Sequence, residues 1–370
     1  VPILTEHAVR ELLTDATGAV IGVLVETPDG LKRVRGRQAV IVATGGYAHN
    51  TDMIQRYQEV FAYGSCAMPS SQGDFIPLAS RVGAQMGNLH GAWRCGVVLE
   101  QALENRSVGT GLFVPPGDSI LLVNRFGQRF VNEHRNYNDR SRSHATFDPN
   151  RVEFPNEFQF MVYDQRIVET VGEQNGQPPI KPAESYVISG QTLSDLAQNI
   201  AARVEALAPR LGGYELDKSF AQNLKDTVQS FNQYAVKGHD PDFGRGELPY
   251  DNAWQQLWAL PTYTETHPAN PYPNLSLHPL AAEGPYYAII LAPGLLDTNG
   301  GPLTDSSARV VDKDFQPIPG LYGAGNCICA PTRNAYAGAG GTLGPALTYG
   351  YIAGKHALTQ GARNSDSRSA

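Results

Sequence analysis

Short apolar runs that lead into turns open the chain. Residues 19–25 are apolar and largely β-branched, a Pro-Asp-Gly turn follows, and residues 31–37 alternate with basic side chains, which predicts two strands joined by a turn. A third apolar run, residues 38–42, leads into Gly45 and Gly46. This pattern is typical of a buried strand whose following backbone comes close to a ligand, although an ordinary strand-to-loop turn would give the same letters.

The middle of the chain has longer periodic stretches. Residues 121–124 and 129–133, separated by a turn that contains Gly127, predict a β-hairpin. Apolar residues at helical spacing and polar residues at helix starts predict three helices. They are residues 74–87, with Asp74 near the N-terminus, residues 192–207, with Ser194 as the cap, and residues 217–236.

The end of the chain returns to the character of its beginning. A proline-rich passage over residues 261–285 has no periodicity and is typical of a linker between lobes. The pattern predicts strands over residues 286–291 and 320–323 and a helix over residues 342–360. We therefore expect one lobe that is interrupted by an inserted middle lobe. A length of 370 residues agrees with two lobes, because a single domain usually has about 100–200 residues.

Composition and charge narrow the class of protein. Hydrophobic residues make up 41% of the chain, which is enough for a packed core, and the formal net charge is −7 without blocks of lysine or arginine. Because nucleic-acid binding needs a basic face, this balance argues against a nucleic-acid partner. No apolar run approaches the roughly 18–20 residues of a membrane-spanning helix. We expect a cytoplasmic enzyme, with peripheral attachment to a membrane left open.

Two glycine-rich segments near the C-terminus are candidates for binding an anion or a carbonyl group. Residues 323–326 (GAGN) resemble a phosphate-binding turn without its third glycine, so a plain tight turn stays an alternative. Residues 338–345 (GAGGTLGP) place several glycines at the start of the predicted helix 342–360. Unpaired backbone N–H groups at a helix start, together with the helix dipole, favour a negatively charged or polarised ligand there.

The histidines and cysteines give no sign of a metal site. The nine histidines show no metal-ligand spacing, and Cys327 and Cys329 form a Cys-x-Cys pair without companions. Four cysteines in a chain of this length do not make a disulfide framework. Cys66 and Cys95 are expected to be buried or partly exposed thiols rather than nucleophiles.

Two of the 17 tyrosines have a suggestive context. Tyr137 follows the predicted strand 129–133, and Tyr336 lies just before the glycine-rich segment 338–345. A phenol can act as a general base or can donate a hydrogen bond to a carbonyl when its site adjusts its pKa. From spacing alone, simple packing stays the alternative for each.

Five segments, in order along the chain, carry a resemblance to a known superfamily. They are residues 40–46 (VIVATGG), 72–75 (QGDF), 122–133 (LVNRFGQRFVNE), 298–301 (TNGG) and 318–326 (IPGLYGAGN). Together they resemble the FAD-dependent 3-ketosteroid dehydrogenase and fumarate reductase superfamily. Phe75 replaces the second glycine of that superfamily's Gly-Asp-Gly helix start.

Further residues favour the 3-ketosteroid Δ1-dehydrogenase-like branch. Residues 240–246 (DPDFGRG) and 335–346 (AYAGAGGTLGPA) resemble segments of the steroid enzymes. Fumarate reductases instead have an arginine near the position of Tyr137, a histidine at the position of Leu296-Asp297, and an arginine in the final glycine loop. Because a buried dicarboxylate substrate needs such cations, their absence from the sequence disfavours a carboxylate reductase.

The resemblance implies an α/β fold, α+β overall, in which a Rossmann-like FAD-binding domain is interrupted by an inserted α+β capping domain that holds the substrate. By the same resemblance, residues 1–106 and 284–370 belong to the FAD-binding domain, and residues 107–283 form the capping domain.

The resemblance also implies FAD as the cofactor and dehydrogenation of a 3-ketosteroid, or a similar cyclic ketone, next to its carbonyl. Tyr336 and the backbone N–H of Gly340 would hold the carbonyl, Tyr137 would take the proton, and the hydride would pass to flavin N5. A quinone is the implied electron acceptor. The residues expected to contact FAD are Ala43, Thr44, Gly45, Gly46, Gly73, Asp74, Gly325, Asn326, Thr342, Leu343 and Gly344.

The superfamily's opening strand, its Gly-x-Gly-x-x-Gly turn and its ribose-binding acid have no match in this sequence. We therefore expect a missing segment or a separate chain to supply the ADP-binding half. Two alternatives stay open. One is a flavin-dependent reductase of an activated double bond, with Arg140, Arg142 or Arg333 facing the substrate; the other is a non-catalytic fragment or one piece of a split flavoenzyme.

Overall fold

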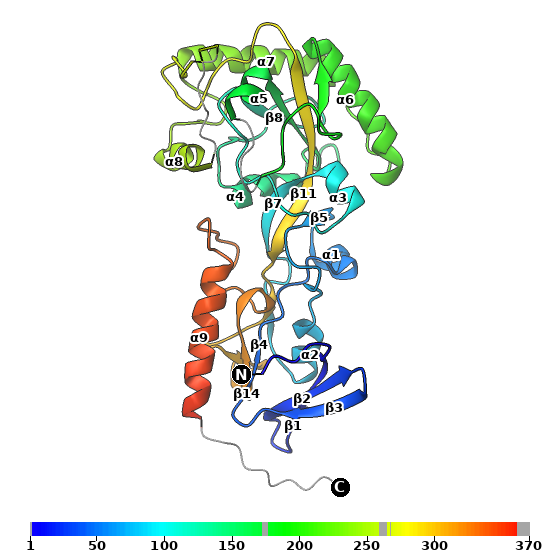
Figure 1. Ribbon diagram of the computed structural model, residues 1–370, viewed down its shortest axis with the longest axis vertical. Helices are drawn as coiled ribbons and strands as arrows, with labels where there is room; N and C mark the ends of the chain where they lie inside the picture. The colour runs from blue at the N-terminus through cyan, green and yellow to red at the C-terminus, as the bar shows by residue number, and fades with distance from the viewer. Residues whose placement is uncertain (1, 172–176, 259–264, 267, 361–370) are drawn as a thin grey trace. The chain divides into compact units, whose positions relative to one another are not determined.

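The computed structural model describes residues 2–171, 177–258, 265–266 and 268–360, which form two compact units (Figure 1). The first unit comprises Val1–Glu59, Ala67–Trp93 and Leu296–Ala370, and the second comprises Val60–Cys66 and Arg94–Leu295. The predicted mixed α/β class is confirmed, since sheets and helices occur in both units. The domain limits expected at 106/107 and 283/284 stay a prediction, because compactness alone does not define a domain of common function.

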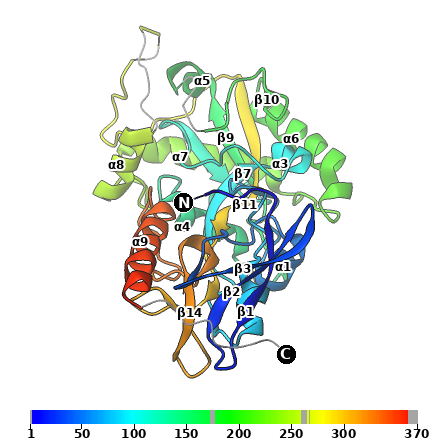
Figure 2. The ribbon, with the colours of Figure 1, turned by 60° about the horizontal axis from the view of Figure 1, so that its bottom comes forward.

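Two three-stranded sheets form the first unit's frame. The strands β1 (Ala8–Thr14), β2 (Val20–Thr27) and β3 (Gly30–Arg35) form an antiparallel sheet and lie side by side in Figure 2. In the other sheet, β14 (Pro317–Gly323) pairs in parallel with β4 (Val40–Val42) and antiparallel with β13 (Arg309–Val311). Segments from opposite ends of the sequence therefore meet.

The helices of the first unit are α1 (Thr51–Tyr57), α2 (Phe75–Arg81) and α9 (Leu343–Thr359). Phe75 and Leu78 of α2 enter the core beside Leu321 of β14. The prediction of a helix over residues 74–87 was too long, because Gly83 adopts a φ of +82° and Met86–Gly87 forms β6, which pairs with β12 (Gly301–Pro302).

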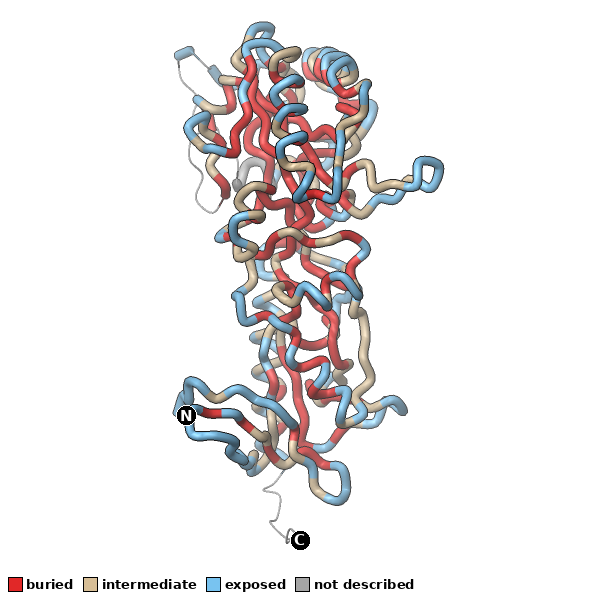
Figure 3. Tube along the Cα trace, turned by 90° about the vertical axis from the view of Figure 1, so that its right-hand side faces the viewer, coloured by how far each residue is buried: buried red, intermediate tan, exposed pale blue. Residues whose placement is uncertain are grey.

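One long strand, β11 (Tyr286–Thr298), organises the sheet of the second unit. The strand order is β10 (Ile188–Gly190), β11, β9 (Gln159–Asp164), β8 (Ile120–Val123), and β5 (Gly64–Ser65) and β7 (Ala92–Val98) also pair with β11. Nearly every residue of β11 is buried, and buried positions dominate this sheet in Figure 3. The strand extends beyond the predicted 286–291 because it gains partners along its length.

The helices of the second unit are α3 (Leu99–Glu104), α4 (Tyr137–Ser141), α5 (Gln165–Val171), α6 (Leu193–Leu207), α7 (Phe220–Lys237) and α8 (Pro249–Trp258). The cap predicted for α6 was wrong. Thr192, not Ser194, is the N-cap, and it forms a capping box with Asp195.

The hairpin expected over residues 121–133 was confirmed in its first strand and its turn, where the Asn124 N–H donates to the Gln128 carbonyl at 3.0 Å, but its second strand was wrong. β8 pairs with β9, and only a single bridge, between Val123 and Arg129, joins it to the expected second strand. The reason is that Arg129 and Glu133 enter a cluster of buried ion pairs instead of a ladder. The predicted linker 261–285 lies partly outside the described residues, at 261–264 and 267. Across the described chain, every helix is too short or too polar to cross a membrane.

Candidate cofactor and substrate site

Parallel pairing brings two predicted glycine turns of the first unit to one sheet edge. Leu321 pairs with Val40 and Gly323 with Val42, so the segments that follow β4 and β14 leave the sheet on the same side. Ala43 and Thr44, directly after β4, are exposed. Gly45 and Gly325 adopt φ values of +74° and +79°, which other residues rarely adopt.

Asp297 of β11 joins the two turns. Its carboxylate accepts hydrogen bonds from the Gly46 N–H at 2.9 Å and from Asn326 Nδ2 at 3.1 Å. The neighbouring Thr298 Oγ1 accepts from the Tyr47 N–H at 2.7 Å. Burial raises the pKa of Asp297, and the hydrogen bonds from Gly46 and Asn326 oppose that rise. Sequence reasoning missed this role, and the only local signal is an acid at the end of an apolar run.

Close packing around the first turn leaves no room for side chains. A Cβ on Gly46 would overlap Thr298 Oγ1 and lie 2.7 Å from the carbonyl oxygen of Thr298. A Cβ on Gly73 would lie 2.7 Å from Tyr47 Cβ, and Gly73 donates its N–H to the Gly46 carbonyl at 2.9 Å. Asp74 follows as the N-cap of α2, where it is exposed and makes no side-chain cap hydrogen bond.

In contrast to the first turn, the glycine loop before α9 leaves open space beside Gly340 and Gly344. Gly340 has a φ of +89°, and a Cβ on Gly340 or Gly344 would meet nothing within 4 Å. Among the described residues, the N–H groups of Gly340, Thr342 and Leu343 have no hydrogen-bond acceptor. Gly344 donates to the Gly340 carbonyl at 2.7 Å. The start of α9 therefore presents free donors at the positive end of a helix dipole.

Tyr336 lies beside this loop and is held from two sides. Its ring centroid lies 5.1 Å from that of Trp93, whose indole N–H donates to Asn326 Oδ1 at 3.3 Å. A Cβ on Gly341 would overlap Tyr336 Cε2 and lie 2.8 Å from Cδ2. Trp93 is thus a further residue of this site that the sequence pattern did not reveal, and Gly341, within the predicted glycine loop, gains a packing role against Tyr336.

The first unit therefore gathers most of the residues expected to contact FAD. Gly73 bonds to Gly46, Asp297 links Gly46 to Asn326, and a Cβ on Gly325 would lie 3.4 Å from Ala346 Cβ on α9. Crowded glycine turns and unpaired N–H groups suit a large ligand that carries carbonyl or phosphate oxygens. The residues present fit the flavin-bearing part of FAD.

Tyr137 lies in the second unit, as the first residue of α4. It is 5% exposed, and its ring centroid lies 5.0 Å from that of Phe113. Asn136 caps the helix by accepting from the Asn138 N–H at 2.8 Å, and Asn138 Oδ1 accepts from the Arg94 N–H at 3.0 Å. The short helix is fixed at its first turn.

Buried charges hold the loop that leads to Tyr137. Arg129 donates to both carboxylate oxygens of Glu133 at 2.8 Å and to both of Asp240 at 2.9 and 3.1 Å. Arg245, fully buried, donates to Glu133 at 3.3 Å and lies 3.0 Å from His134 Nε2. Burial favours a neutral Glu133, but the two arginines outweigh it and lower its pKa.

This cluster explains the segment 240–246 in structural terms. Asp240 and Arg245, two of its three charged residues, pair with Arg129 and Glu133, more than 100 residues earlier in the chain. Burial and the neighbouring charge of Arg245 lower the pKa of His134 well below its usual value, so this imidazole is neutral. The segment therefore supports the loop before Tyr137.

Arg140 is not an available anchor for a substrate carboxylate. It is 3% exposed, and its guanidinium donates to the carbonyls of Glu133, Arg135 and Leu112 at 2.9–3.0 Å. Burial lowers its pKa to about 10. Arg142 and Arg333, the other two cations considered, are exposed.

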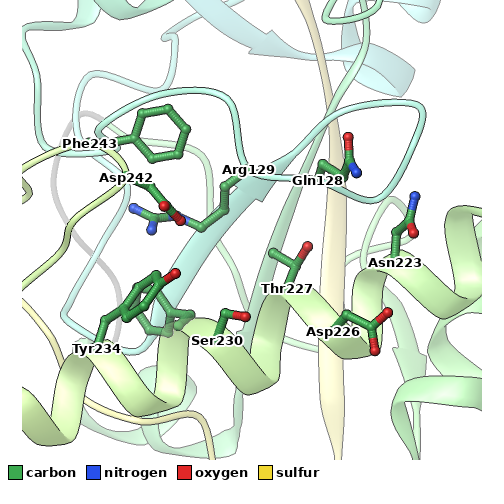
Figure 4. A pocket seen from close by; sticks show the side chains of 10 residues that line it. Gln128, Arg129, Asn223, Asp226, Thr227, Ser230, Tyr234, Asp242 and Phe243 are labelled. Atoms are coloured by element: carbon green, nitrogen blue, oxygen red, sulfur yellow. The ribbon is translucent and has the colours of Figure 1, made fainter.

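A pocket of about 550 Å³ opens beside α7 in the second unit (Figure 4). Its wall includes Arg129, Asp226, Tyr234 and Asp242. Arg129 is already paired with Glu133 and Asp240, and Tyr137 does not line this pocket. The pocket lies beside the ion-pair cluster, and it is not the site expected from the sequence.

The predicted catalytic residues fall into both units, Tyr336 and Gly340 in the first and Tyr137 in the second. Their joint action stays a prediction. Within the described ranges, no group of three or more His, Cys, Asp or Glu side chains could hold a metal ion.

Residues 1–343 match the family model described as "FAD binding domain". The chain belongs to this family. The match covers the glycine turns, the loop that leads to Tyr137 and the start of α9, and the family's description gives FAD as the cofactor. The superfamily predicted from the sequence is thereby confirmed.

Relatives with assigned activities include dehydrogenases of cyclic ketones and also reductases, such as vinyl phenol reductase of Lactiplantibacillus plantarum at 27% identity over 96% of this chain and 68% of that protein. The chain is 35% identical to 4-oxocyclohexanecarboxylate 2-dehydrogenase of Sinomonas cyclohexanicum, over 96% of this chain and 57% of that protein. It is 30% identical to 3-oxosteroid 1-dehydrogenase of Mycobacterium tuberculosis, over 97% and 60%. The crystal structure of 3-ketosteroid Δ1-dehydrogenase from Sterolibacterium denitrificans superposes with a TM-score of 0.78 at 28% identity, over 97% and 60%. The chain spans about 60% of the length of the three dehydrogenases.

Proposed function

We propose that this protein takes part in FAD-dependent dehydrogenation of a cyclic ketone, forming a C=C bond next to the carbonyl. The proposal rests on the loop 336–344. In this loop Tyr336 packs against Trp93 and Gly341, and free N–H donors follow at the start of α9. Relatives that act on 4-oxocyclohexanecarboxylate and on 3-oxosteroids support the same reaction class.

FAD, when bound, would supply the hydride acceptor. Ala43 to Gly46, Gly73, Asp74, Gly325 and Asn326 would hold it at the edge of the β4–β14 sheet. Thr342 and Leu343 would direct their free N–H groups at its electron-rich carbonyl edge, with Gly344 beside them as a residue without a side chain. Asp297 would act as a positioning residue, because it joins two of these segments.

The side chains of this protein would handle the carbonyl and the proton. The Tyr336 hydroxyl and the Gly340 N–H would donate to the ketone oxygen and stabilise the negative charge that develops there. That polarisation makes the neighbouring C–H more acidic, and Tyr137 would remove its proton as a phenolate. The buried cluster around Glu133 would keep the Tyr137 loop in place.

The substrate could be a 3-ketosteroid or a smaller cyclohexanone. Both ring systems present the same ketone to Tyr336 and Gly340, so the named site residues do not separate them. A steroid would place the protein in lipid degradation, with a quinone as a plausible class of electron acceptor.

The ADP-binding half of the FAD site is proposed to come from polypeptide outside these 370 residues. Leu343, Leu347, Tyr351 and Leu358 of α9 are 67–74% exposed, which is unusual for large apolar side chains at helical spacing. A further segment that packs on this stripe, in the same chain or in a separate one, would cover it.

An activated-double-bond reductase is the second candidate. It is weakened because Arg140, one of the three arginines named for it, is buried and bound to backbone carbonyls, whereas Arg142 and Arg333 are exposed. A non-catalytic fragment is the third. It would retain the fold without binding flavin.

The test is anaerobic addition of a 3-ketosteroid, and separately of 4-oxocyclohexanecarboxylate, to FAD-loaded protein while the visible flavin absorption is recorded. Bleaching by either ketone is expected. Tyr137→Phe and Tyr336→Phe should each slow bleaching by about 100-fold or more with flavin still bound. Tyr272→Phe, which removes a hydroxyl elsewhere in the second unit, is the matched control.

Unchanged rates in both site variants would contradict the assigned roles. Persistent yellow colour with both ketones, but reoxidation of reduced protein by an acrylate-type acceptor, would favour the reductase. Failure of these 370 residues to take up FAD would support the proposal that further polypeptide supplies the ADP-binding half.

A further inference from the structure

Two thiols in the second unit lie unusually close together. Cys66 follows β5 and Cys95 lies within β7, and both strands pair with β11. The two Sγ atoms are 4.0 Å apart. Cys66 is partly exposed and Cys95 is fully buried, so an oxidant in solution can reach only the first directly.

The surroundings keep the pair in contact. The Cys66 N–H donates to the Leu295 carbonyl of β11 at 2.8 Å, which fixes its backbone. A Cβ on Gly111 would lie 2.5 Å from the Cys95 sulfur, so this sulfur packs closely against the backbone of Gly111. The buried Cys95 sulfur is therefore held by close packing at a position 4.0 Å from the Cys66 sulfur.

The two thiols also differ in reactivity. A hydrogen bond from Cys95 lowers the pKa of Cys66 against the effect of burial, while the same hydrogen bond and burial raise the pKa of Cys95. A partly exposed thiol of low pKa next to a second thiol is the usual arrangement for a peroxide-sensitive cysteine and its resolving partner.

We propose that Cys66 and Cys95 form a redox modification site, in which a hydroperoxide oxidises Cys66 and Cys95 then closes a reversible disulfide. The Cys66 thiolate attacks the terminal peroxide oxygen, the O–O bond breaks, and a sulfenic acid forms with release of an alkoxide, or of hydroxide when the oxidant is hydrogen peroxide. The Cys95 sulfur next attacks the Cys66 sulfur, the S–O bond breaks, and the Cys95 proton leaves with the departing oxygen as water. Closure needs the sulfurs to move from 4.0 Å to about 2.0 Å.

The position of the pair gives the bond a consequence. Cys66 is the last residue of its segment before the chain re-enters the first unit, and Cys95 is the second residue after the chain leaves it again. A disulfide would link these two connections covalently and would limit their separation on unfolding. Oxidation should therefore raise Tm, and dithiothreitol should reverse the rise.

The other two cysteines provide the control. Burial raises the pKa of Cys327 to about 11 and also raises the pKa of Cys329. Cys327 is buried and its Sγ donates to the carbonyls of Val42 and Ala324, whereas Cys329 is partly exposed like Cys66. Cys329→Ser is thus the matched variant, because it removes a partly exposed thiol of ordinary or weaker acidity.

The experiment treats reduced full-length protein with hydrogen peroxide, alkylates the remaining thiols, and maps peptides by mass spectrometry. The expected product is a Cys66–Cys95 cross-linked peptide that lacks two hydrogen atoms and disappears on reduction. The cross-link should persist in Cys329→Ser and vanish in Cys66→Ser. Dimedone should label Cys66 in Cys95→Ala, and at least about tenfold faster than it labels Cys329.

Two results would overturn the proposal. One is that Cys66 and Cys95 both stay open to alkylation, after unfolding, at peroxide concentrations that already oxidise Cys329. The other is that native protein accumulates Cys66 sulfinic acid without a cross-link. If Cys95→Ala fails to fold, the cross-link in native protein and its loss in Cys66→Ser still decide the question.

Discussion

The glycine turns of the first unit and the Tyr137 loop of the second unit achieve precise placement by opposite means. Around Gly46 and Gly341, the missing side chains create the shape, and in the loop that contains Gly341 the groups offered to a ligand are the backbone N–H donors of Gly340, Thr342 and Leu343. Around Tyr137, fully buried arginines and acids fix the backbone through charged hydrogen bonds. A side chain added at Gly46 or Gly341 would overlap neighbouring atoms. In the charge cluster, loss of one partner would instead leave a buried charge uncompensated.

The largest effect is expected from the charge cluster. Arg245→Met should lower the free energy of unfolding by about 3 kcal/mol or more, because Glu133 and the Ile120 carbonyl lose a buried cationic donor. Urea denaturation followed by circular dichroism measures this change. Arg142→Met, at an exposed position, should change it by less than about 0.5 kcal/mol. Equal effects in the two variants would show that the cluster adds no stability.

Acid should weaken the second unit through a buried histidine. His144 donates from Nδ1 to the Glu157 carbonyl at 2.8 Å, and burial lowers its pKa to about 4. In the unfolded chain the pKa of His144 is ~6.5, so below pH ~6.5 the unfolded state binds a proton that the folded state does not. The free energy of unfolding therefore decreases as the pH falls from ~6.5 toward 4, by up to ~3 kcal/mol.

The variant His144→Gln should flatten this pH dependence in denaturation curves measured between pH 7 and pH 4. His239→Gln, at a side chain that is 65% exposed, should leave it unchanged. An unaltered slope in His144→Gln would assign the acid sensitivity to other groups, with the buried His134 as the first to examine.

A pair of glycine variants separates crowding from ligand contact. Gly46→Ala should destabilise the protein by about 2 kcal/mol, since its Cβ would overlap Thr298. Gly344→Ala meets open space and should add up to ~1 kcal/mol of helix stability while weakening FAD binding. Thermal unfolding and flavin titration measure both quantities. Unchanged FAD affinity in Gly344→Ala would remove the start of α9 from the cofactor site.

The smallest effect concerns α6, which lies outside both regions and provides a baseline. Thr192→Ala should cost about 1 kcal/mol, because the capping box with Asp195 is lost. Ser194→Ala should be nearly neutral, since Ser194 is not the cap. The reverse ranking in urea denaturation would restore the cap predicted from the sequence.

Local pattern was sufficient for elements whose partners are close in sequence. The periodicity of α6 and α7, the β2–β3 pair and the glycine turns at residues 45–46 and 323–326 were predicted within a few residues. The strand predicted over residues 129–133 does not form, although its residue types suit a strand, because Arg129 pairs with Asp240, 111 residues away. A rule based on neighbouring residues cannot predict this competition between strand pairing and a distant ion pair.

The sequence by itself determined the superfamily and the cofactor class through ordered motifs. It also determined the strand-to-glycine segments and the long helices α6, α7 and α9, because turns and periodicity depend on neighbours within one or two turns of chain. Tertiary structure alone decided that Asp297 bonds to Gly46 across 251 residues, that Trp93 supports Tyr336, that Arg140 is committed to carbonyls, and that Cys66 meets Cys95. These contacts depend on strand pairing between distant segments, whose free energy is shared over the whole sheet and is not recorded at any single position.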